Sequence, residues 1–69
     1  MSLPQKLKTL RAEHNMTQAE LGRQINVARA TIAGYETRNR QPSYEKLTAI
    51  AETFQVSADY LLDSTDEPI

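Results

Sequence analysis

The stretch from Thr17 to Glu36 constrains this chain most, because it has the pattern of two short helices joined by a tight turn. Thr17 followed by Glu20 predicts a capping box, in which the hydroxyl and the carboxylate each bind a backbone N–H of the first turn. Asn26 marks the break, since Asn tolerates the left-handed conformation that a sharp turn needs. Gly22 is expected where two crossing helices come closest. The stretch therefore predicts two helices that pack against each other across a turn.

Apolar residues at helical spacing predict three further helices around this pair. The stripes are Leu3, Leu7 and Leu10 in the first helix, Leu47, Ile50, Ala51 and Phe54 in the fourth, and Tyr60, Leu61 and Leu62 in the fifth. Ser2, Ser43 and Ser57 stand where N-caps would begin these helices. The sequence therefore predicts an all-α domain of five helices over residues 1–62, followed by a frayed acidic tail over residues 63–69.

Size and composition exclude several classes of protein. Sixty-nine residues suffice for one small domain with a modest core. The absence of Cys excludes disulfides and thiolate metal ligands. No apolar run approaches the ~20 residues of a membrane span, and no signal peptide is visible, so we expect a cytosolic protein. A single His, no glycine-rich phosphate loop and no converging carboxylates favour neither an enzyme nor a metal or cofactor site. His14 is expected near the end of the first helix, where it suits the helix dipole.

These residues together resemble the helix-turn-helix domain of the lambda-repressor-like family (Cro/cI-type, xenobiotic-response-element regulators). The matching residues of the motif are Gln18, Leu21, Gly22, Ile25, Val27, Ile32, Tyr35 and Glu36. Arg11, the stretch QPSYEKLTAIAETF and the closing VSADYLL extend the resemblance over residues 4–62. It implies a compact five-helix bundle that binds duplex DNA sequence-specifically and regulates transcription, most often as a repressor. A homodimer on an inverted-repeat operator would space its half-sites by ~34 Å or a multiple.

The distribution of charge agrees with a DNA-binding role, although the net charge is −1. All eight Lys and Arg lie in residues 1–46 with only four acids, which gives that part +4. Residues 47–69 have five acids and no base, which gives −5. Such segregation suggests one face for phosphates. Small domains also acquire uneven charge by chance, so this pattern alone leaves both explanations open.

The resemblance makes residues 28–36 the recognition helix, whose N-terminal side chains would enter the major groove. The candidate base contacts are Arg29, Ala30, Thr31 and Ala33. An Arg can bind guanine O6 and N7 with two hydrogen bonds, whereas the two alanines offer only methyl contact, for instance with thymine. Gly34 stands where relatives usually carry a larger side chain, and it contributes nothing to recognition and weakens the helix. A solvent-facing Arg29 is the alternative.

The candidate phosphate contacts are Gln18, Arg38, Arg40, Tyr44 and Lys46. The N-termini of the second and fourth helices can hold phosphate oxygens with free backbone N–H groups. In the family the matching Gln also braces the recognition helix. The alternative for Gln18 is an ordinary polar residue of a first turn, and the alternative for Tyr44 is a side chain that covers the edge of the core. Thr37–Arg38 replaces the family's usual Asn-Gly, so the helix before it should lack the low-cost left-handed cap that Gly provides.

The resemblance also implies a partly buried salt bridge between Arg11 and Glu36, with two solvated charges as the alternative. A rival function is a protein-interaction module, such as an antitoxin or a co-regulator subunit. Ala30, Ala33 and Gly34 favour it, because a helix poor in long polar side chains suits a partner helix. An exposed Tyr60 or Leu62 would be a candidate dimer contact.

Overall fold

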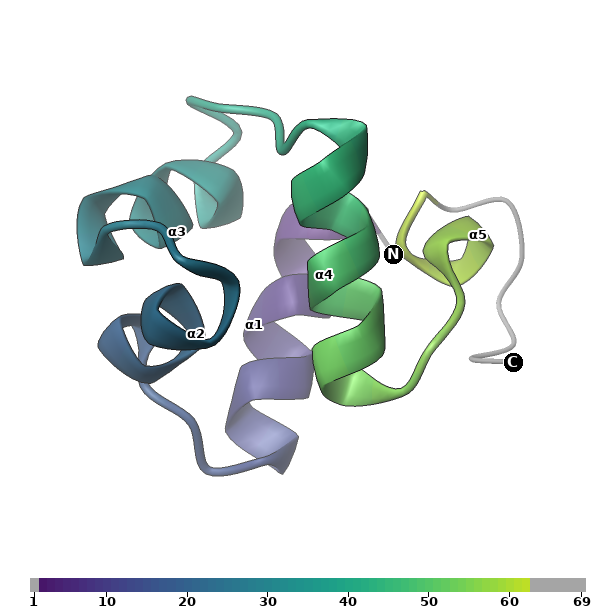
Figure 1. Ribbon diagram of the computed structural model, residues 1–69, viewed down its shortest axis with the longest axis horizontal. Helices are drawn as coiled ribbons and strands as arrows, with labels where there is room; N and C mark the ends of the chain where they lie inside the picture. Colours follow the sequence, from purple (N-terminus) through teal and green to yellow (C-terminus); the bar gives the residue numbers. More distant parts are fainter. Residues whose placement is uncertain (1, 63–69) are drawn as a thin grey trace.

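This computed structural model describes residues 2–62, which form five α-helices and the loops between them (Figure 1). They are α1 (Leu3–Glu13), α2 (Gln18–Ile25), α3 (Arg29–Glu36), α4 (Tyr44–Phe54) and α5 (Ala58–Leu61). The all-α prediction is confirmed. The predicted acidic tail, residues 63–69, lies outside the described residues. Within residues 2–62 no helix is both long and apolar enough to cross a membrane.

Side-chain caps begin α2, α4 and α5 where the sequence predicted them. Thr17 Oγ1 accepts from the N–H of Glu20 at 3.0 Å, and Glu20 Oε1 accepts from the N–H of Thr17 at 2.8 Å. At α4 and α5 the hydroxyl alone acts as the cap, because Ser43 Oγ accepts from the N–H of Lys46 and Ser57 Oγ accepts from the N–H of Tyr60. The exceptions are α1, where the predicted N-cap Ser2 has an Oγ without a hydrogen-bond partner, and α3, whose N-cap is Ala28 and has no capping side chain. Such a cap contributes about 1 kcal/mol, so α3 depends more than its neighbours on packing.

The helices enclose one core to which all five contribute. In Figure 1, α4 runs through the middle of the view, with α2 and α3 on one side of it and α5 on the other. The helix α3 packs against α1 and α2, while α5 packs against α1 and α4. The buried residues of the core are Leu7, Leu10, Leu21, Ile25, Ile32, Tyr35, Leu47, Ile50, Ala51, Phe54 and Leu61. The outward side of α3 is consequently left uncovered by other helices.

The turn between α2 and α3 explains why Gly22 is needed. Asn26 ends α2 in the left-handed conformation, with φ of 62°, as predicted. This turn folds the chain back, and the N–H of Val27 donates to the carbonyl oxygen of Gly22 at 2.8 Å. A Cβ at Gly22 would lie 2.6 Å from the carbonyl oxygen of Val27. The expected crossing of two helices at Gly22 was therefore wrong in detail, because the closest neighbour is the turn.

The loop after α3 contains a strained residue. Arg38 has φ of 67°, so the left-handed conformation is present even though Gly is missing. An L-residue with a Cβ adopts this conformation at a cost of roughly 1–2 kcal/mol. On both sides of Arg38 the chain is bonded to α3. The N–H of Thr37 and the N–H of Arg40 donate to the carbonyl oxygen of Gly34, at 3.3 and 3.2 Å.

Candidate nucleic-acid interface

A buried ion pair ties α1 to the end of α3. Arg11 Nε donates to Glu36 Oε2 at 2.5 Å, and Arg11 Nη2 donates to Glu36 Oε1 at 2.9 Å. Arg11 Nη1 also donates to the carbonyl oxygen of Met16 at 2.9 Å. Glu36 is only 4% exposed. The structure thus brings together the two residues that the resemblance paired, in the bidentate geometry that Arg and a carboxylate favour.

The surroundings keep both members of this pair charged. Burial of Glu36 acts to raise its pKa, but the hydrogen bonds from Arg11 and Gln18 oppose it, and the pKa ends below its ordinary value. The hydrogen bond to Glu36 raises the pKa of Arg11, and burial only partly offsets this. Each charge therefore depends on the other, so removing one would leave its partner unpaired.

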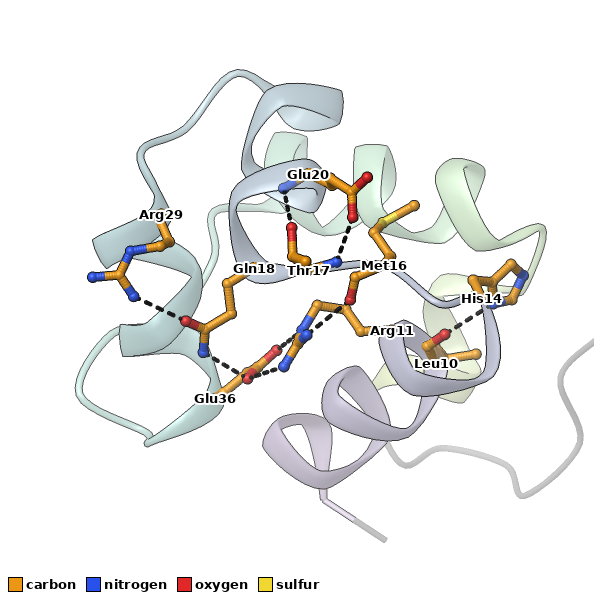
Figure 2. A network of polar contacts seen from close by, with 9 residues as sticks. All are labelled: Leu10, Arg11, His14, Met16, Thr17, Gln18, Glu20, Arg29 and Glu36. Carbon is orange, nitrogen blue, oxygen red and sulfur yellow. Dashed lines mark hydrogen bonds and ion pairs between the residues drawn. The ribbon is translucent and has the colours of Figure 1, made fainter.

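The polar network continues from the ion pair to the surface of α3 (Figure 2). Gln18 Nε2 donates to Glu36 Oε1 at 3.1 Å, and Arg29 Nη1 donates to Gln18 Oε1 at 3.1 Å. The two partners fix the orientation of the amide, because a carboxylate only accepts and a guanidinium only donates. Gln18 thus connects a buried carboxylate to an exposed guanidinium, and it restrains Arg29 at the solvent-exposed start of α3.

The predicted base contacts all lie on solvent-accessible parts of α3. Arg29 and Ala30 are exposed, and Thr31 and Ala33 are partly exposed. Ile32, Tyr35 and Glu36 form the buried side of the same helix. The outward side carries one long polar side chain at its start and small side chains after it.

Gly34 is buried although it lies on the outward side of α3. A Cβ built on Gly34 would lie 3.2–3.4 Å from Cβ, Cγ and Cδ of Arg40. The aliphatic stem of Arg40 therefore covers Gly34. This contact was missed in the sequence, which shows only that both residues are near the end of the helix.

The four predicted phosphate contacts that follow α3 in the sequence divide into two groups. Arg38, Arg40 and Tyr44 are exposed, and Tyr44, at 78% exposure, does not cover the edge of the core. Lys46 instead turns inward, and its Nζ donates to the carbonyl oxygen of Ile25 at 2.8 Å. This bond ties α4 to the C-terminal end of α2, a role that sequence reasoning missed because it depends on two distant segments.

Lys6 is a second Lys with an unpredicted structural role. It is 1% exposed, its Nζ donates to the carbonyl oxygen of Tyr60, and it lies 4.2 Å from the centroid of the Tyr60 ring. The contact joins α1 to α5 through a cation–π interaction. The spacing contained a signal, because Lys6 lies three residues after Leu3 and four before Leu10, on the apolar stripe.

His14 has a structural place at the end of α1. It is the C-cap residue, and its Nδ1 donates to the carbonyl oxygen of Leu10 at 2.8 Å. Its ring lies against Phe54, with the centroids 5.0 Å apart. In the described residues no three metal-ligating side chains gather around it or elsewhere.

Exposed bases gather at α3 and the loop that follows it. The exposed bases Arg29, Arg38 and Arg40 belong to α3 and the loop that follows it. Asp59 lies on α5, across α4 from α3 (Figure 1). The outward side of α3 therefore faces solvent among positive charges, as an anionic partner requires.

Comparison with known proteins places this geometry in a family. The model of the helix-turn-helix family HTH_3 matches residues 7–61. The uncharacterized HTH-type transcriptional regulator YobD of Bacillus subtilis is 38% identical over 64 residues, which cover 93% of this chain and 57% of YobD. The uncharacterized HTH-type transcriptional regulator MJ0272 of Methanocaldococcus jannaschii is 36% identical over 62 residues, covering 90% of this chain and 94% of that protein. The chain thus spans little more than half of YobD and nearly all of MJ0272.

Solved structures give the same result. The crystal structure of the P22 c2 repressor in complex with a synthetic operator matches with a TM-score of 0.88 and 28% identity, covering 94% of this chain and 98% of that one. A transcriptional regulator from Listeria innocua matches with a TM-score of 0.87 and 29% identity, covering 96% of this chain and 62% of that one. With the family model spanning most of its length, the chain belongs to the HTH_3 helix-turn-helix family of Cro/cI-type domains.

Proposed function

We propose that this chain binds duplex DNA sequence-specifically through the outward side of α3 and regulates transcription as a repressor. The observation that carries this proposal is the chain of hydrogen bonds from Arg11 through Glu36 and Gln18 to Arg29. It holds one polar side chain in place at the exposed start of a helix that other helices leave uncovered on its outward side. The similarity to a repressor solved on its operator supports the same placement.

Arg29 and its neighbours would provide the contacts to bases. One N–H of Nη1 is bound by Gln18, which leaves the other guanidinium donors of Arg29 for a guanine edge. Thr31 adds a hydroxyl two residues further along α3, and Ala30 and Ala33 add methyl groups that suit thymine. A restrained Arg loses less side-chain entropy on binding than a free one.

The phosphate contacts would position the domain rather than select the sequence. The helix N-terminus at Gln18 supplies backbone N–H groups, and the second N–H of the Gln18 amide is also available. Arg38 and Tyr44 are exposed beyond the end of α3. Lys46 keeps its bond to Ile25, so it would reach a phosphate only with its remaining N–H groups.

We also propose a homodimer on an inverted repeat, as the resemblance implied. Leu62 is 54% exposed, directly after α5, and is the candidate contact between copies. The rival, a protein-interaction module, needs an apolar patch over α3 or α5. The exposed large hydrophobic residues of the described part are Tyr44, at the start of α4, and Leu62, after the end of α5, so neither α3 nor α5 carries an exposed patch of them and the DNA-binding function is favoured.

Selection of bound sequences from a random duplex pool, followed by affinity measurements against salt, tests this function. We expect an inverted repeat with half-sites about one DNA turn apart and an affinity that falls steeply with salt. Weak, salt-sensitive binding without enrichment of any sequence would contradict the proposal and favour a protein partner.

A further inference from the structure

Gly34 is buried although it lies on the side of α3 that points away from the core. In a helix the pole opposite the buried Ile32 and Glu36 belongs to Ala30 and Gly34, which are one turn apart. Ala30 is exposed there, but Gly34 is buried. A residue that points away from the core can be buried only if something else covers it, and the stem of Arg40 does so at Gly34.

The backbone fixes Arg40 in this position. Its N–H donates to the carbonyl oxygen of Gly34 at 3.2 Å, and the N–H and Oγ1 of Thr37 donate to the same oxygen at 3.3 Å. The left-handed Arg38 turns the chain back toward the helix between these two residues. Arg40 is thus held against α3 in two ways, by the hydrogen bond of its backbone N–H and by the contact of its side-chain stem with Gly34.

The absence of a side chain at position 34 makes this arrangement possible. The three stem carbons of Arg40 lie within 3.4 Å of the place that a Cβ would occupy, which is closer than ordinary van der Waals contact. A Cβ at position 34 would shift the stem by a few tenths of an ångström, and a longer side chain would shift it further. Within the described residues no hydrogen bond or ion pair engages the guanidinium of Arg40, so its donors remain available.

We propose that Arg40 is a specificity-determining residue that contacts a base edge in the major groove, in place of the side chain that α3 lacks at Gly34. This inference rests on the proposed function and changes the predicted role of Arg40 from a phosphate contact to a base contact. Arg29 at the start of α3 and Arg40 at its end then frame the two alanines. Each guanidinium can bind one guanine through O6 and N7.

The test compares sequence preference and salt dependence for wild type, Arg40→Ala and Arg40→Lys, using duplexes selected from a random pool and single-base variants of them. We expect Arg40→Ala to lose about tenfold to a hundredfold in discrimination at one base pair per half-site. Arg40→Lys should show the same loss of discrimination, because Lys keeps the charge but lacks the planar, bidentate guanidinium. A uniform loss on all duplexes, restored by Lys and accompanied by a salt slope smaller by about one, would overturn the inference.

Gly34→Ala provides a second test, independent of charge. The added Cβ should shift the Arg40 stem by a few tenths of an ångström, so discrimination at the same base pair should fall measurably while folding stability does not, since Ala is the better helix former. In the Arg40→Ala background, Gly34→Ala should change the preference no further. Unaltered preference in Gly34→Ala would count against the pairing. Failure of the wild type to select any sequence would instead refute the proposed function itself, and the two failures are therefore distinguishable.

Discussion

Replacing Glu36 by Ala should destabilise the domain strongly. The substitution removes the acceptor of two hydrogen bonds from Arg11 and one from Gln18. Arg11 would keep only the carbonyl oxygen of Met16 among these partners, while its side chain remains only 19% exposed. The loss therefore includes the cost of a guanidinium left partly buried without its counter-charge.

The magnitude follows from the burial of the two partners. Breaking a fully buried pair costs about 3–5 kcal/mol, and the residual exposure of Arg11 reduces this to about 2–3 kcal/mol. A domain of this length is stable by roughly 3–10 kcal/mol. At about 4–8 °C per kcal/mol for a domain of this size, the Tm should fall by roughly 10–20 °C.

Urea unfolding followed by circular dichroism measures the free energy, and a thermal melt gives the Tm. Glu13→Ala is the matched control, because Glu13 is an exposed acid on α1 and its removal should change stability by less than about 0.5 kcal/mol. The double variant Arg11→Met/Glu36→Leu should recover much of the loss, since it strands no charge. If Glu36→Ala lost no more stability than Glu13→Ala, the reasoning from a buried, mutually dependent pair would be refuted.

Other substitutions test other parts of the structure. Arg38→Gly should raise the free energy of unfolding by about 1 kcal/mol, because Gly adopts the left-handed conformation without strain; an unchanged or lower value in urea would contradict this. Gly22→Ala should cost roughly 1–3 kcal/mol, because its Cβ would meet the carbonyl oxygen of Val27, and a melt as stable as wild type would show that the turn yields. Folding lowers the pKa of Glu36, so as the pH falls its carboxylate binds a proton in the unfolded chain before it does so in the folded one. Stability should thus fall as the pH drops below about 4.3 toward the folded-state pKa, and Glu36→Gln should show a flatter acid limb in pH-dependent urea titrations.

Local features of this fold could be predicted from the sequence because their causes are local. The capping pair Thr17 and Glu20, the left-handed Asn26 and the apolar stripe of α4 each depend on residues within a few positions of one another. Such features keep their meaning in isolation, because hydrogen bonds and helical periodicity over one turn do not depend on the rest of the chain. They were sufficient to predict an all-α bundle.

Contacts between distant segments could not be predicted in the same way. The bond from Lys46 to Ile25 and the stem of Arg40 over Gly34 arise only after the helices have packed. The pairing of Arg11 with Glu36 was anticipated through the resemblance, since their spacing in the sequence does not bring them together. Sequence reasoning found the outward face of α3, whereas the side chain that covers its far end required the structure.

The affinity of Arg29→Ala for the selected operator and for random duplex is the most direct test of whether α3 recognises bases. The geometry predicts a loss on the operator of about tenfold to a hundredfold, with relaxed preference at one base pair of each half-site and little change on random duplex. Equal losses on both duplexes would show that Arg29 binds only the DNA backbone, and would contradict sequence recognition through this end of α3.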